Sequence, residues 1–192
     1  MVQSSNQRLT LEEFLALPEG DVTYEFVNGE AVPKYKNDEI GAKFFHSSTT
    51  GALLILLSVW AKEKGRVVIE WAIKLIRNQQ DWMPVPDLTY VSYQRLPVDW
   101  LLDEACPVAP ELVIEIISPG QTFGEIAEKA IDYLKAGVSR VWVVDTKART
   151  ITVFAPSSLP INYRADGVIT DDLLPELEIT PNTIFQRAGL IP

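Results

Sequence analysis

The sequence contains one cysteine, Cys106, and one histidine, His46, among 192 residues. A lone cysteine excludes a disulfide bond within the chain. One cysteine together with one histidine also excludes a zinc site of the ordinary ligand type within a subunit. Because proteins without disulfides are typical of reducing compartments, we expect a cytoplasmic protein that binds no zinc.

Basic residues are also scarce, since 17 lysines and arginines stand against 26 acidic side chains and give a net charge of -9. This balance argues against a protein that coats nucleic acid non-specifically, so any nucleic-acid contact must be local. The strongest local basic cluster consists of Lys34, Lys36 and Lys43. These lysines are candidate nucleic-acid contacts, and the alternative is an ordinary solvated loop.

Long apolar runs are absent as well. The longest candidate, residues 51–61, is interrupted by Ser58 and falls short of the roughly 20 residues that span a membrane. The first ten residues lack the apolar core of a signal peptide. We therefore expect no membrane segment, a disordered start over residues 1–8, and a single domain over residues 1–192.

Several common catalytic motifs are missing too. The chain has no G-x-S-x-G of a serine hydrolase, no G-x-G-x-x-G of a dinucleotide site and no P-loop. What the chain does have is an informative stretch from Glu111 to Gly137. It begins with a nearly unbroken β-favouring run, typical of a central strand covered on both faces. Glu115 lies inside this run, where an unpaired charge costs on the order of several kcal/mol, so it must pair with or bind a cation.

A helix is predicted after the turn at residues 118–120, and Gly137 ends it. Glu125, Lys129 and Tyr133 are spaced four apart and share one face of this helix. A short strand-to-helix connection packs the helix back on the sheet, so this face can point at the end of the Glu115 strand. The structural alternative is that Lys129 only pairs with Glu125 one turn away.

The remaining pattern predicts an α/β (α+β) fold with a mixed central β-sheet flanked by helices. Asn28-Gly29 between two β-rich arms predicts an N-terminal hairpin, and Asp166-Gly167 predicts a C-terminal edge hairpin. The pattern further predicts helices over 10–17 and 42–64, one long strand over 66–77, a polar loop over 78–84, strands over 88–92, 139–145 and 150–154, and a short final helix or turn.

Three more polar residues stand at the ends or on the mixed faces of predicted elements. Glu25 shares a hairpin face with Val27, His46 begins the apolar stripe of a helix, and Asp87 follows Pro86 at the start of a strand. Each has an ordinary alternative. Glu25 can be a solvated carboxylate, His46 a hydrogen-bonded structural histidine, and Asp87 a turn residue.

Asp87 and Glu115, at the ends of neighbouring strands with a lysine converging on them, suit a hard divalent cation such as Mg²⁺ or Mn²⁺. Such a cation polarises a phosphoryl oxygen and acidifies a water, while Lys129 orients that water or balances developing charge. We therefore expect the two carboxylates to lie close enough to share one cation. Phosphodiester hydrolysis is the reaction class that these groups fit.

The chain contains, in this order, YEFVNG, a helix begun by a histidine, PDLTYV, ELVIEIISP, a helix with lysine and tyrosine four apart, and VWVVD. This order resembles the Uma2 family of restriction endonucleases, which belongs to the PD-(D/E)xK nuclease superfamily. The resemblance extends from Leu9 to Phe185 and depends on several motifs in order, none of which is specific alone. It implies a single restriction-endonuclease-like domain with Asp87 at the PD position and Glu115 at the (D/E) position.

The superfamily pattern places a lysine two residues after the second acid, where this chain has Ile117. The resemblance implies that Lys129 replaces it from the following helix. By the same resemblance Glu125 and Tyr133 lie beside Lys129, and Glu25 and His46 fall on further polar positions of the family. Lys74, on the mixed face of the long predicted strand, is the second candidate for the lysine.

Three hypotheses follow for the function. The leading one is a Mg²⁺- or Mn²⁺-dependent DNA endonuclease that acts as a homodimer, since enzymes that cut two strands commonly pair through a two-fold axis. The second is a catalytically inactive protein of the same fold that serves as a binding or regulatory module. The third is a hydrolase of smaller phosphoesters, which the acidic composition would suit better than long DNA.

Overall fold

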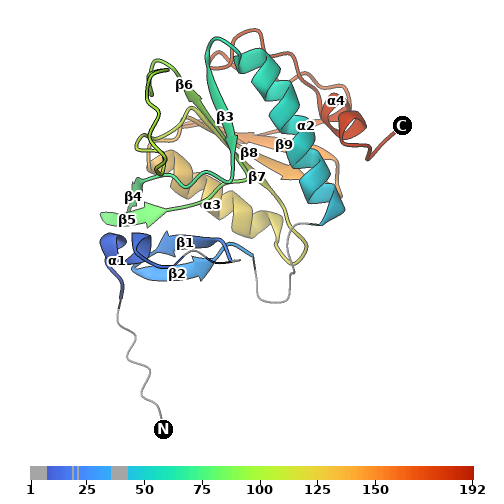
Figure 1. Ribbon diagram of the computed structural model, residues 1–192. Coiled ribbons are helices and arrows are strands. Elements are labelled where there is room, and N and C mark those ends of the chain that lie inside the picture. Colours follow the sequence, from blue (N-terminus) through green and yellow to red (C-terminus); the bar gives the residue numbers. More distant parts are fainter. Residues whose placement is uncertain (1–7, 19, 21, 36–42) are drawn as a thin grey trace.

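The structure, a computed structural model, describes residues 8–18, 20, 22–35 and 43–192. It is a mixed α+β fold in which two β-sheets are flanked by helices (Figure 1), and it confirms the predicted fold class. The expected disordered start falls, apart from Arg8, outside the described residues.

The larger sheet has six strands in the order β10-β9-β8-β7-β6-β3. Their bounds are β3 Gly65–Ile69, β6 Leu88–Ser92, β7 Leu112–Ile116, β8 Arg140–Asp145, β9 Thr150–Phe154 and β10 Ile161–Arg164. β7 and β8 are parallel and are joined through the helix α3, Phe123–Lys135, whereas the other neighbouring pairs are antiparallel. The central position of β7 explains why its five residues are all buried.

Two helices cover opposite faces of this sheet (Figure 1). The long helix α2, Phe44–Ala61, packs Leu53 and Leu57 on one face, together with the short C-terminal helix α4, Pro181–Arg187. Helix α3 packs Ile126 and Tyr133 on the other face. A capping box at Thr122 starts α3, because its side chain accepts from the Glu125 N–H and the Glu125 carboxylate accepts in return.

Alternation along the strands decides which face each acid takes. Leu112, Ile114 and Ile116 of β7 lie in the core under α2, and Val113 lies in the core under α3, so Glu115 belongs to the α3 face. The same alternation along β6 places the side chains of Leu88 and Tyr90 in the core under α2 and that of Val91 in the core under α3. Asp87, four residues before Val91, therefore takes the same face as Glu115.

The smaller sheet has four strands in the order β2-β1-β5-β4 and lies against α3 (Figure 1). Its strands are β1 Tyr24–Val27, β2 Glu30–Pro33, β4 Leu75–Arg77 and β5 Gln80–Met83. The predicted N-terminal hairpin is confirmed, with Asn28 and Gly29 both at positive φ in its turn. The helix α1, Leu11–Leu15, begins with the predicted capping box at Thr10 and packs Phe14 on Phe26.

Two of the predicted elements are wrong in the same region. The long strand expected over 66–77 is divided between the two sheets, as β3 and β4. The break follows Ile69, where Glu70 adopts a positive φ of 48°. The loop expected over 78–84 is instead a tight turn at Asn78 and Gln79, both at positive φ, followed by the strand β5. Apolar alternation continues through the break, so the sequence pattern alone does not reveal it.

The C-terminal edge hairpin exists, but its turn differs from the predicted one. β9 and β10 pair as an antiparallel hairpin through residues 155–160. Asp166 and Gly167 come after β10, where the Gly167 N–H donates to the Arg164 carbonyl. This turn leads into the bridge between Ile169 and Ile179 rather than joining two strands.

Among the described residues, α2 alone is long and apolar enough, by length and composition, to cross a membrane. The same property is expected of a core helix, and α2 buries Ala52, Leu53, Leu57 and Ala61 against the fold.

Candidate active site

The two acids highlighted by the sequence lie across from each other at the ends of β6 and β7, two neighbouring inner strands of the larger sheet. β6 and β7 pair with Leu88 opposite Ile114, and continuing this register by one residue places Asp87 opposite Glu115. Directly opposed residues of an antiparallel pair share a face and lie close together. Both acids are buried at the ends of these strands, where Glu115 contacts α3 and Asp87 contacts His46 of α2. The strand register thus places the two acids at neighbouring positions.

Glu115 is held by two groups of α3. The Tyr133 hydroxyl donates to Glu115 Oε1 at 2.8 Å, and Lys129 Nζ lies 2.9 Å from the same oxygen. Tyr133 is fully buried, and its ring packs at 4.8 Å from that of Trp82 in β5. Burial raises the pKa of Glu115, and the nearby negative charges of Asp87 and Glu25 add to this effect, while the Lys129 ammonium opposes it.

Lys129 joins the two sheets, because its ammonium also donates to Glu25 Oε1 of β1 at 2.8 Å. The same Glu25 oxygen accepts from the Val85 N–H at 3.0 Å. Burial alone would lower the pKa of Lys129, but the charges of Glu115 and Glu25 raise it, so the side chain is a cation at neutral pH. Glu25 is buried, and the alternative of a solvated hairpin carboxylate is wrong.

Asp87 has three partners of different kinds. His46 Nε2 of α2 lies 3.1 Å from Asp87 Oδ2, and the Ile116 N–H donates to the same oxygen at 2.7 Å. Lys34 Nζ forms an ion pair at 2.8 Å with Asp87 Oδ1. Burial works against ionisation, yet the bond from His46 and the charge of Lys34 outweigh it and hold the pKa of Asp87 well below its usual range. The alternative of a simple turn residue is therefore wrong.

The sequence groups Lys34 with two other lysines of a polar segment, but the structure places it inside the acid cluster. Its ammonium lies 3.4 Å from Glu70 Oε1, in addition to its ion pair with Asp87. Tyr35 donates to the same Glu70 oxygen at 2.9 Å. Glu70 lies next to Asp87 because its N–H donates to the Asp87 carbonyl at 3.2 Å.

The other predicted residues lie outside these contacts. Glu125 is exposed and takes part in the capping box, so the alternative of Lys129 bound only to Glu125 does not describe the structure. Lys74 lies in the segment that connects β3 to β4, directly before β4. Its ammonium is 3.6 Å from the Glu104 carboxylate, and both side chains are exposed to solvent. Lys43 is exposed at the start of α2. Lys36 is outside the described residues.

Sequence reasoning missed Lys34, Tyr35 and Glu70 as members of the cluster. Glu70 carried no signal in the sequence, because its positive φ, which is uncommon for a non-glycine residue and often marks a functional site, is visible only in the structure. Lys34 follows Pro33 at the end of the hairpin, and only the fold brings it to Asp87.

Asp87 and Glu115 are the residues that could hold a divalent cation. Among the described residues no group of three or more His, Cys, Asp or Glu side chains is arranged to hold a metal. Mg²⁺ keeps several waters and needs only one or two carboxylates, which Asp87 and Glu115 supply. Asp87 Oδ1 is buried and forms an ion pair with the Lys34 ammonium at 2.8 Å, so a metal ion at this oxygen would have to displace the ammonium.

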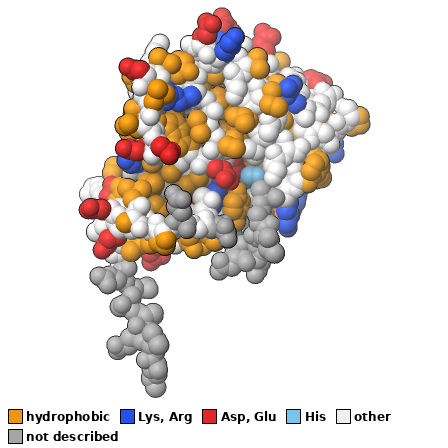
Figure 2. Space-filling view, in the orientation of Figure 1, with side chains coloured by type: hydrophobic (Ala, Val, Ile, Leu, Met, Phe, Trp, Pro, Cys, Tyr) orange, Lys and Arg blue, Asp and Glu red, His pale blue; other side chains and the backbone are white. Residues whose placement is uncertain are grey.

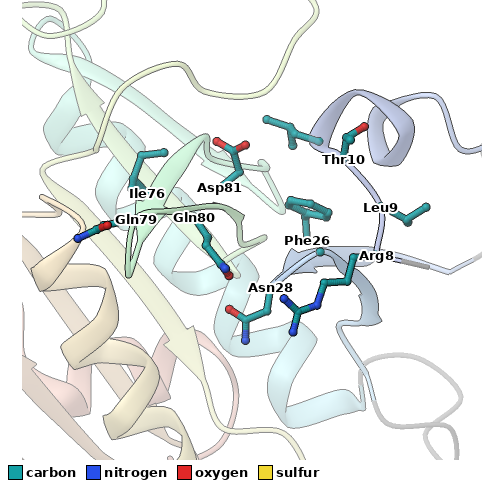
Figure 3. Close-up of a pocket in the computed structure, with 11 residues that line it drawn as sticks. Arg8, Leu9, Thr10, Phe26, Asn28, Ile76, Gln79, Gln80 and Asp81 are labelled. Carbon is teal, nitrogen blue, oxygen red and sulfur yellow. The ribbon is translucent and has the colours of Figure 1, made fainter. Parts of the chain in front are cut away.

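Solvent reaches the cluster through a cavity of about 280 Å³ between α2 and the end of β3, lined by His46, Ser47, Thr50, Gly51, Leu54, Ile69, Glu70 and Asp87. In Figure 2 the lone histidine is visible on this face beside acidic and basic side chains. A second cavity of about 370 Å³ lies between α1, the N-terminal hairpin and the β4–β5 turn (Figure 3). None of the clustered acids or lysines lines this second cavity.

Comparison with known proteins identifies a family and similar solved structures. The chain matches the model of the Uma2 family, described as "Putative restriction endonuclease", over residues 11–182. It also resembles the crystal structure of "a putative nuclease belonging to DUF820" from Anabaena variabilis ATCC 29413, with a TM-score of 0.79 and 23% identity, over 94% of this chain and 99% of that one. At this identity the structural likeness supports the fold. No curated protein matches the chain.

Proposed function

The chain belongs to the Uma2 family, and from this premise we propose that it is a metal-dependent endonuclease that hydrolyses phosphodiester bonds of DNA. One observation carries the proposal: Asp87 and Glu115 are opposed on one face, and the Lys129 ammonium lies 2.9 Å from Glu115. Two carboxylates and an ammonium at one buried point are costly for folding, which favours a catalytic reason for keeping them.

In this proposal Asp87 and Glu115 hold Mg²⁺ or Mn²⁺. When bound, the cation polarises a phosphoryl oxygen and lowers the pKa of a water. Lys129 orients the attacking water and balances the negative charge that develops on the phosphate in the transition state. Glu25 positions this ammonium through the 2.8 Å contact, and Tyr133 fixes the carboxylate of Glu115 by donating to it.

His46 positions the other acid. A carboxylate only accepts hydrogen bonds, so His46 Nε2 carries the hydrogen in its bond to Asp87 Oδ2. The Ile116 N–H donates to the same oxygen. These two donors fix one oxygen of Asp87 and turn Oδ1 toward the side where Lys34 lies.

The decisive experiment measures cleavage of supercoiled plasmid and of single-stranded DNA with Mg²⁺, with Mn²⁺ and with EDTA. We expect cleavage only with a metal ion, and its loss in Asp87→Asn. Lys129→Met should lower turnover roughly a hundredfold to a thousandfold while still binding Mg²⁺ in calorimetry. Lys74→Met is the matched control, because its partner Glu104 lies outside the cluster. Cleavage in EDTA, or equal activity of Lys129→Met and wild type, would overturn the proposal.

A second candidate is a binding or regulatory module that does not cut. It is favoured by the ion pairs of Lys34 and Lys129, which already balance Asp87 and Glu115. Binding of DNA without cleavage under all metal conditions would support this candidate. A third candidate, hydrolysis of small phosphoesters, is supported by turnover of a nitrophenyl phosphodiester in the absence of DNA cleavage.

A further inference from the structure

A small cavity of about 220 Å³ adjoins the acid cluster on its other side. It lies between the first turn of α2 and the loops that follow β7 and β8, and its walls include Phe44, Phe45, Ile117 and Pro119. Ile117 comes two residues after Glu115. His46 lines this cavity and also the one that reaches Asp87. His46 thus borders this cavity and also contacts Asp87.

Two aromatic rings of this cavity are strongly exposed. Phe44 and Phe45 are 67% and 50% exposed, and their ring centroids are 5.9 Å apart at an interplanar angle of 59°. Phenylalanines as exposed as these gain only part of the stability that full burial would give. Aromatic rings beside a phosphodiester-cleaving site are suited to stacking on nucleobases, and such stacking does not depend on base identity.

Among the described residues, the charged side chains that line this cavity are two lysines, in a protein whose net charge is -9. Lys43 at the start of α2 and Lys147 after β8 both line it and are exposed. The first turn of α2 contains no acidic residue, so the helix dipole adds to the attraction for an anion. The cavity also lies at the carboxyl ends of the parallel strands β7 and β8, where open α/β sheets commonly bind ligands.

His46 forms part of the wall that this cavity shares with the one reaching Asp87. Its side chain is buried, and its Nδ1 has no hydrogen-bond partner among the described residues. This nitrogen has almost no solvent-accessible surface, so the stacking and phosphate contacts of the cavity do not depend on it.

We propose that this cavity is a subsite for one unpaired nucleobase of the substrate strand, which stacks on Phe44 and Phe45 while Lys43 and Lys147 contact the neighbouring phosphates. The inference rests on the proposed nuclease function and narrows it to single-stranded or locally unpaired DNA. A base held in a duplex is already stacked and cannot enter the cavity unless it is extruded.

The test is equilibrium binding of a short fluorescein-labelled oligodeoxynucleotide in EDTA, as a single strand and as a duplex, followed by anisotropy. The wild type should prefer the single strand. The double variant Phe44→Ala/Phe45→Ala should bind the single strand roughly 5-fold to 150-fold more weakly. Phe44→Leu/Phe45→Leu keeps apolar bulk and should lose most of the same affinity, because leucine has no aromatic face. Val59→Ala, exposed near the other end of α2, is the control and should bind like wild type.

Lysine variants test the phosphate contacts separately. Lys43→Ala/Lys147→Ala should reduce the dependence of log K on log salt by about 0.7 per lysine, whereas the exposed Lys62→Ala should leave it unchanged. An oligonucleotide that carries aminopurine, a fluorescent base whose emission is quenched on stacking, should report stacking directly in wild type and not in the alanine double variant.

Binding and cleavage separate this inference from the proposed function. Phenylalanine-dependent binding of single strands without cleavage supports the subsite and contradicts the nuclease activity. Plasmid cleavage with unchanged single-strand binding in both phenylalanine double variants overturns the subsite and leaves the nuclease intact. Absence of any DNA binding by wild type overturns both.

Discussion

Lys34 Nζ lies 2.8 Å from Asp87 Oδ1, and the two side chains are only 5% and 3% exposed. The carboxylate proposed to bind a divalent cation is therefore already paired with a cation of the protein itself. The Lys34 ammonium also lies 3.4 Å from Glu70 Oε1, and the Glu70 side chain is half-exposed. When a metal ion binds Asp87, the Glu70 carboxylate can still balance the charge of the Lys34 ammonium.

This pairing predicts that Lys34→Met binds Mg²⁺ more tightly than wild type, by roughly tenfold, which corresponds to about 1.4 kcal/mol. The ammonium both repels an incoming cation and competes for its oxygen, and methionine removes both effects. Calorimetric titration of Mg²⁺ measures the affinity. Lys64→Met, which breaks the exposed pair with Glu176, is the control and should bind Mg²⁺ as wild type does. Weaker binding by Lys34→Met would show that the lysine supports the metal site.

Lys129→Met should destabilise the metal-free protein by about 2 to 4 kcal/mol, because Glu25 and Glu115 would lose the ammonium they share in a mostly buried position. Lys74→Met should cost less than about 1 kcal/mol, since its pair with Glu104 is exposed and 3.6 Å long. Urea denaturation in EDTA measures both. If both variants unfolded at the same urea concentration, Lys129 would not stabilise the protein through Glu25 and Glu115.

Glu115→Gln should leave the metal-free protein as stable as wild type or more stable. The pKa of Glu115 is raised, chiefly by burial, so folding favours its protonated form, and the ionised form costs stability at any pH above its unfolded pKa. Glutamine is neutral, and its side-chain oxygen can still accept from the Tyr133 hydroxyl. DNA cleavage should meanwhile fall at least about a hundredfold. A lower melting temperature at pH 7 in EDTA would refute this account.

Asp87 should make the metal-free protein sensitive to acid. Its pKa in the folded state is depressed, as His46 and Lys34 outweigh the effect of burial. A depressed carboxylate contributes stability above its unfolded pKa of about 3.9, and this contribution is lost as the pH falls below that value. The raised pKa of nearby Glu115 acts in the opposite direction. Melting temperature in EDTA should therefore drop more steeply below about pH 4 in wild type than in Asp87→Asn.

The expected homodimer can be tested at the sheet edge formed by β10. Leu159 and Ile161 are 87% and 55% exposed there, and an edge strand with exposed apolar residues can pair with a second copy. Leu159→Asp/Ile161→Asp should shift the protein from dimer to monomer in light scattering. Leu101→Asp/Leu102→Asp, in the exposed connector before β7, is the control. A monomeric wild type at high concentration would contradict the dimer.

Local signals explain why much of the fold could be predicted from the sequence. The apolar run of β7, the Asn28-Gly29 turn and the α3 face with Lys129 and Tyr133 depend on neighbouring residues alone. The division after Ile69 could not be predicted, because Glu70 leaves one sheet for the other without interrupting the apolar alternation. β5 was missed because polar Gln80 and Asp81 stand at its exposed start.

The candidate site was predictable where strand order and helix spacing fix it, as for Asp87, Glu115 and Lys129. Lys34 was not, because a lysine after proline in a polar segment is normally solvated. Its burial depends on the counter-charges of Glu70, directly after β3, and Asp87, directly before β6. An ion pair between residues far apart in the sequence leaves no recognisable pattern in the sequence around either residue.

The link from Glu25 to Lys129 also bears on biosynthesis, since the two residues are separated by 104 positions. The N-terminal hairpin leaves the ribosome early, but Glu25 has no ammonium partner until α3 has been translated. Nascent chains that end before α3 therefore contain Glu25 and Glu115 but lack Lys129, which pairs with both of them in the folded protein. An enzyme able to cut DNA would, in this arrangement, acquire its cutting ability only once most of its chain has emerged and folded.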